Sequence, residues 1–242
     1  MQVLTAQQPA AVETNEQIFA RVYSLVSGNA ARGSDPPKVV CLLKPYVNTM
    51  GKLHLAAGTL EVRLHEMIAS APATVREALA WILVSKLFRK HAPPHFLLHY
   101  RQYMNRKDVR HTHQAVRRVR GRKFVSGPQG GHYDLDAIYL DLQARYFHPL
   151  MPKPLLGWSR RPSRTLLGHF DSAHNAIILS SILDRPSVPR LAVEYVLYHE
   201  MLHLKHPVEH RGSRRRVHTR DFLAAEKLFL GLKEAKEMLK KL

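Results

Sequence analysis

Five consecutive residues decide how the C-terminal half of the chain folds and what it can bind: His199-Glu200-Met201-Leu202-His203. They lie within the apolar segment 191–205, whose pattern predicts a helix. Residues four apart share one face of a helix, so the two imidazoles can chelate a single metal ion. Glu200 lies about 100° around the helix from His199. It is therefore too offset to be a ligand and is placed to accept a proton from water activated by zinc.

The flanks of this motif indicate a buried helix. Val196, Leu197 and Leu202 are apolar, Pro189 suits a first helical turn, and Pro207 ends the segment. Histidines on an apolar helix need a specific reason to be there, because an unsatisfied buried polar group is costly. The competing interpretation is a helix that merely carries two hydrogen-bonded histidines.

A catalytic zinc site needs a third protein ligand and one open coordination position. Four residues that follow the motif in the chain are candidates for this third ligand. His206 would continue the same helix, His210 lies in the predicted basic loop 208–217, and Glu226 would suit a later helix that supplies a carboxylate. His218 begins the predicted final helix, which can turn back onto the motif after the loop. We therefore expect the metal ligands to be His199, His203 and His218.

Asp221 follows His218 in the first turn of this predicted helix. Its carboxylate would either orient a ligating imidazole or simply be an acid favoured by the helix dipole. The sequence leaves both interpretations open.

The pattern His199–His203, fourteen intervening residues, then His218-x-x-Asp221-Phe222 resembles the SprT-like domain shared with the Spartan proteases. Four upstream segments also resemble that family: Tyr146-Phe147, Gly157-Trp158-Ser159, Leu167-Gly168 and Ile177-Ile178-Leu179-Ser180. The resemblance covers residues 134–235. It departs from the family at the end of the chain, because the C-terminal Cys-rich zinc ribbon of many members is missing and Cys41 is the sole cysteine.

This resemblance implies an α+β, zincin-like metallopeptidase domain: a helix, a three-stranded antiparallel sheet, the HExxH helix and a third-ligand helix. It implies zinc held by His199, His203 and His218, with Glu200 as catalytic base. The implied activity is that of an endopeptidase acting on nucleic-acid-associated proteins. Hydrolysis of a non-protein amide would use the same chemistry and is a third hypothesis.

Hydrophobic patterns predict the other elements of residues 131–242. A helix is expected over 134–147, and one long amphipathic helix over 218–241. Strands are expected over 156–160, 165–170 and 176–181, with a hairpin turn at 172–175.

The N-terminal region, 1–130, is expected to form a separate part with a small antiparallel β-meander and several helices. Its strands are predicted at 39–43, 52–55 and 60–64, and its helices at 15–26, 74–90 and 95–105. Thr74 and Glu77 have the spacing of a capping box. The breaker residues of 124–131 place the boundary near residue 130.

Charge points to a polyanionic partner, most simply DNA. The chain has 37 Lys and Arg residues against 19 Asp and Glu, a net charge of +18. The predicted contacts lie in the basic stretch 106–123 and in loop 208–217: Arg117, Arg118, Arg120, Arg122, Lys123, Arg214, Arg215 and Arg216. The stretch could instead pack on an acidic partner, and the loop could be merely solvated.

An alternative function is therefore a basic nucleic-acid-binding module with no peptidase activity. Its zinc would be structural, and His206 or His210 would have to close a four-ligand site.

Two further features bear on location. No run approaches the roughly 18 apolar residues of a membrane span, and residues 1–14 lack the basic and apolar regions of a secretory signal. A single cysteine, Cys41, allows neither an internal disulfide nor a Cys-based zinc module. The expected location is the cytoplasm, with association to the nucleoid if DNA is the polyanion.

Overall fold

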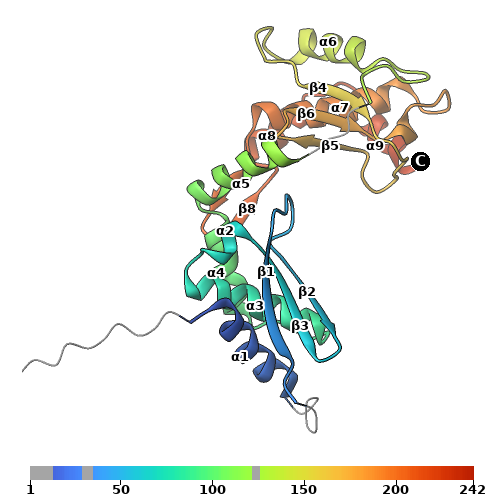
Figure 1. Cartoon of the computed structure of the whole chain (residues 1–242). Helices are drawn as coiled ribbons and strands as arrows, with labels where there is room; N and C mark the ends of the chain where they lie inside the picture. Colours follow the sequence, from blue (N-terminus) through green and yellow to red (C-terminus); the bar gives the residue numbers. More distant parts are fainter. Residues whose placement is uncertain (1–12, 29–34, 122–125) are drawn as a thin grey trace, which may run out of the picture. The chain divides into compact units, whose positions relative to one another are not determined.

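The computed structural model describes residues 13–28, 35–121 and 126–242, which fold as a mixture of helices and small sheets (Figure 1). They divide into two compact units. The first lies within residues 1–113 and includes 212–214, and the second comprises 114–211 and 215–242. The division falls within helix α5 (Lys107–Arg120), earlier in the chain than the boundary expected near residue 130.

The first unit contains one three-stranded sheet, formed by β1 (Lys38–Lys44), β2 (Gly51–Ala56) and β3 (Thr59–His65). The strand order is β1-β3-β2, with β1 parallel and β2 antiparallel to β3. The predicted antiparallel meander was therefore wrong. Because β3 buries Leu60, Val62 and Leu64, it takes the central position, and β1 pairs with it rather than with β2.

Helices account for most of the remaining first unit: α1 (Asn15–Ser27), α2 (Glu66–Ala69), α3 (Ala73–Leu87) and α4 (Pro94–Met104). The capping box expected at Thr74 and Glu77 was wrong, because Pro72 is the N-cap and no side chain caps α3. Glu77 instead accepts a hydrogen bond from Arg21 of α1 at 2.8 Å. That contact ties the two helices together.

The second unit is also built on a three-stranded sheet, formed by β4 (Leu155–Trp158), β5 (Gly168–Asp171) and β6 (Ala176–Leu179). Its order is β4-β6-β5. β5 is antiparallel to β6, but β4 runs parallel to it, so the expected all-antiparallel sheet was wrong. All four residues of β6 are buried, which suits a central strand with neighbours on both edges.

Helices α6 (Leu135–Tyr146) and α7 (Arg190–Lys205) share the core of this unit with the sheet. Asp134 caps α6 by accepting from the backbone N–H of Asp136 at 2.8 Å. The 3-10 helix η2 (Ser181–Leu183) leads from β6 towards α7. α7 buries most of its length, as the apolar pattern around the motif predicted.

The final helix, predicted over 218–241, is in fact two helices, α8 (Arg220–Glu226) and α9 (Leu232–Lys240). Gly231 separates them in the left-handed conformation, with φ 79°. Phe229, between the helices, is buried against Tyr195 and Tyr198 of α7. Packing of this aromatic side chain and the freedom of glycine together explain the break.

The predicted loop 208–217 contains a short hairpin, β7 (Glu209–Arg211) and β8 (Arg214–Arg216). Gly212 in the two-residue connection has φ 56°, which glycine adopts readily. Among the described helices, none is long and apolar enough to cross a membrane.

Candidate metal centre

Three histidines come together in the second unit. His199 and His203 project from α7, and His218 precedes Thr219, the N-cap of α8. One ligand nitrogen from each lies within 4.8 Å of the others. The rings of His203 and His218 are stacked with centroids 5.3 Å apart, and those of His199 and His218 are 5.0 Å apart. The three residues expected from the sequence as ligands could therefore hold one metal ion.

Phe222 forms an apolar wall for these histidines. Its ring is fully buried and lies 5.0 Å from His199, 4.7 Å from His203 and 4.6 Å from His218, measured between centroids. Thr219 caps α8 by accepting from the backbone N–H of Phe222 at 3.2 Å. The cap thus fixes the first turn of α8, and with it the position of His218.

Glu226 orients one ligand. Its Oε1 lies 2.8 Å from His199 Nδ1 and accepts from the Tyr195 hydroxyl at 2.9 Å. A carboxylate on Nδ1 keeps the proton there and leaves Nε2 for a metal. Glu226 was a candidate ligand from the sequence, but in the structure its carboxylate orients a ligating imidazole. That role was considered for Asp221, which is exposed. Because Glu226 and His199 are 27 residues apart, their hydrogen bond could not be predicted from the spacing of residues in the sequence.

The protonation of the cluster suits metal binding. Burial lowers the pKa of His203 to about 4, helped by the neighbouring His199 and His218. Burial also lowers the pKa of His199, although Glu226 opposes the shift. At neutral pH both imidazoles keep a free lone pair, as ligation requires. Imidazole ligands suit zinc and other late first-row metals.

Glu200, the acid within the motif on α7, is buried, with 6% of its surface exposed. Burial raises the pKa of its carboxyl group to about 7, while a hydrogen bond from the backbone of Phe170 opposes the shift. Such a group can both accept and return a proton near neutral pH. Its position in α7 is as expected from the motif.

Strand β5 approaches Glu200 closely, which sequence reasoning missed. A Cβ at Gly168 would lie 2.9 Å from Cγ1 of Val196 and 3.0 Å from Cγ of Glu200. Only glycine leaves room for the strand there. A glycine inside the predicted strand 165–170 was the available signal, since such residues often mark a bulge or a close approach of the backbone.

A fourth protein ligand does not join the cluster among the residues that the structure describes. His206 is the C-cap of α7, and His210 lies in β7. The two residues named for a closed structural site are therefore outside the group of three. An open coordination position is what a catalytic site requires.

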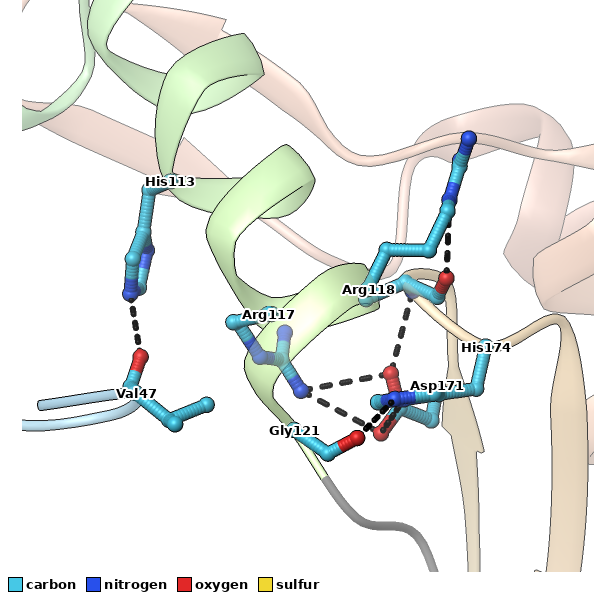
Figure 2. A network of polar contacts seen from close by, with 8 residues as sticks. Val47, His113, Arg117, Arg118, Gly121, Asp171 and His174 are labelled. Carbon is cyan, nitrogen blue, oxygen red and sulfur yellow. Dashed lines mark hydrogen bonds and ion pairs between the residues drawn. The ribbon is translucent and has the colours of Figure 1, made fainter. Parts of the chain in front are cut away.

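The residues expected to contact nucleic acid fall into three sets. Arg117 and Arg118 bond to the protein itself, at Asp171 and the carbonyl oxygen of Ala173 (Figure 2). Arg214, Arg215 and Arg216 form β8 and are all exposed, and Arg120 is also exposed. Arg122 and Lys123 lie outside the described residues.

Comparison of the chain with protein-family models, with curated proteins and with solved structures found no match.

Proposed function

We propose that this protein is a zinc-dependent endopeptidase of the SprT-like type, with a zincin-like second unit. The observation that carries the proposal is the grouping of three histidines, from α7 and the segment that returns to it, with a buried glutamate in α7. Glu226 adds the outer carboxylate that zinc-binding histidines usually have.

Zinc, when bound, would supply a Lewis acid that polarises a carbonyl group and lowers the pKa of water. Glu200 would take the proton of the attacking water, and its raised pKa would let it pass that proton to the leaving amine. Glu226 and Tyr195 would hold the His199 ring in one tautomer throughout. Phe222 would keep bulk water away from one side of the ligands.

A protein substrate is supported by the place of β5 in the sheet. β5 is an edge strand, and its residues Gly168 and Phe170 lie against Glu200. An edge strand is a template for an extended peptide, which can add to the sheet through backbone hydrogen bonds. A peptide bound in that way would present its backbone beside the proposed base.

The basic surface beside the centre supports action on nucleic-acid-associated proteins. β8 ends at Arg216, two residues before His218, and Arg215 lies close enough to His203 to lower its pKa further. Exposed arginines near the metal ligands would attract phosphates of DNA. A cytoplasmic location, with association to the nucleoid, fits such a substrate.

Glu200→Gln is the decisive experiment. The variant should bind about one zinc per chain, as the wild type does, because the amide leaves the three histidines untouched. Cleavage of an unfolded protein such as casein, with and without DNA, should fall to background. Undiminished cleavage by this variant would refute the role of Glu200 and the mechanism.

The alternative, a basic binding module with structural zinc, is favoured only by the charge of the chain and the exposed β8. It predicts tight DNA binding, a zinc ion closed by four protein ligands, and no cleavage by the wild type. X-ray absorption at the zinc edge, which counts nitrogen and oxygen neighbours, and exchange with small anions such as azide separate the two functions.

A further inference from the structure

The last turn of α5 is fastened to the turn that joins β5 and β6, within the second unit. Arg117 Nη2 lies 3.2 Å from both carboxylate oxygens of Asp171, the last residue of β5. Arg118 Nε donates to the carbonyl oxygen of Ala173 at 3.3 Å. Figure 2 shows both arginines reaching the same turn.

His174 completes this contact from the other side. Its Nδ1 lies 3.3 Å from Asp171 Oδ2, and its Nε2 lies 3.3 Å from the carbonyl oxygen of Gly121 (Figure 2). A Cβ at Gly121 would lie 2.3 Å from the carbonyl oxygen of Arg117 and 3.1 Å from His174 Cε1, so glycine fits where α5 ends beside this histidine. The imidazole therefore bridges Asp171 and the residue after α5.

Asp171 is the centre of the network and is buried, with 4% of its side chain exposed. The backbone N–H of Ala173 also donates to its Oδ1 at 3.0 Å. A buried carboxylate requires a nearby positive charge and several donors. Arg117 supplies the charge, so this arginine has a structural reason to point inward.

The strand that Asp171 ends is the one that lies against Glu200. Gly168, at its start, leaves no space for a side chain beside Val196 and Glu200. Phe170, next to Asp171, hydrogen-bonds the Glu200 carboxylate through its backbone. Displacement of β5 would therefore remove the polar contact that aims this carboxylate.

We propose that Arg117 and His174 are positioning residues, which hold Asp171 and thereby keep β5 packed against Glu200. This inference rests on the proposed function, since it assigns a second part of the chain to the same reaction. It also separates the basic residues into two groups, with Arg117 and Arg118 serving the peptidase site and the arginines of β8 available for a polyanion.

The test compares Arg117→Ala, Arg117→Lys and His174→Ala with wild type, all loaded with zinc and free of nucleic acid. Arg185→Ala is the matched control, because it removes one exposed positive charge from the same unit. Two quantities are measured: hydrogen exchange of the Phe170 amide, with the amides of α6 as internal reference, and kcat and KM for a peptide substrate.

In Arg117→Ala we expect exchange at Phe170 to accelerate on the order of tenfold or more while α6 amides keep their protection. We expect kcat to fall on the order of 10–100-fold, more than KM changes, because the base is misaligned. Arg117→Lys should recover part of both effects, His174→Ala should show a smaller loss, and Arg185→Ala should match wild type.

Unchanged exchange at Phe170 in Arg117→Ala would overturn the proposal. Equal acceleration of all amides would also overturn it, because Arg117 would then support the fold in general. If Arg117→Ala does not fold, His174→Ala decides by the same criteria. Hydrogen exchange requires no turnover, so the two proposals can fail separately. Absence of peptidase activity in the wild type would refute the proposed function, while exchange at Phe170 would still test whether Arg117 and His174 hold β5 in place.

Discussion

Glu226 Oε1 lies 2.8 Å from Nδ1 of His199 and joins the end of α8 to the helix that carries the motif. The same oxygen accepts from Tyr195, one turn before His199 in α7. Burial would raise the pKa of Glu226, but these hydrogen bonds lower it below its ordinary value. An ionised carboxylate therefore faces the back of the imidazole.

Replacement of Glu226 by Ala should weaken zinc binding about 10–100-fold, the usual effect of removing such a partner. His199 would lose the acceptor that fixes its tautomer, while the three ligands would remain. Competition with a chromogenic chelator measures the affinity. Glu237→Ala is the matched control, because Glu237 is exposed and pairs with Lys240 away from the centre. Equal zinc affinity of both variants would contradict the assigned role.

His218→Ala should abolish stoichiometric zinc binding, because the variant keeps only two of the three histidine donors. His206→Ala should retain about one zinc per chain, since His206 is not part of the cluster. Metal content after dialysis against a weak chelator distinguishes them. If His206→Ala loses zinc as His218→Ala does, a ligand other than the proposed three is present.

Asp184 supports the segment that leads into α6 and should contribute to stability. Its carboxylate accepts from the backbone N–H groups of Gly131, His132 and Tyr133, at 2.6, 2.9 and 2.9 Å. Burial alone would raise its pKa, but these donors lower it below 3.8. Asp184→Asn should reduce the free energy of unfolding by about 1–3 kcal/mol at pH 7.

The sign of the pH effect follows from the lowered pKa of Asp184. Its stabilisation is present above the ordinary value of 3.8 and is lost as pH falls through the lowered one. The difference between wild type and Asp184→Asn should therefore be largest near neutral pH and shrink below about pH 4. Urea unfolding at several pH values measures it. Asp136→Asn, at a half-exposed surface ion pair, is the control.

The arginines of β8 should account for part of the affinity for DNA. Changing Arg214, Arg215 and Arg216 together to Ala should weaken binding and reduce the slope of log K against log salt by up to about 3, roughly one unit per phosphate contact. Fluorescence anisotropy across a salt series gives the slope. An unchanged slope would place DNA contact elsewhere, while Arg185→Ala should change it little.

Local sequence determined the parts of the site that depend on helical spacing. His199, Glu200 and His203 follow from the HExxH pattern within an apolar helical segment, because residues four apart lie on the same face of a helix. His218 followed from a plausible return of the chain after a loop. The structure brings its ring to 5.0 Å from that of His199.

Tertiary packing decided the features that join residues far apart in the chain. Glu226 pairs with His199 because α8 packs against α7, a contact between residues 27 apart in the chain. Buried Phe229 and Gly231 divide the final helix, which periodicity alone made continuous. Gly168 and Asp171 matter only because β5 lies against α7 and next to the end of α5. Strand order likewise places the most buried strands, β3 and β6, at the centres of the two sheets. Such contacts are set by three-dimensional fit, and neither spacing nor composition records them.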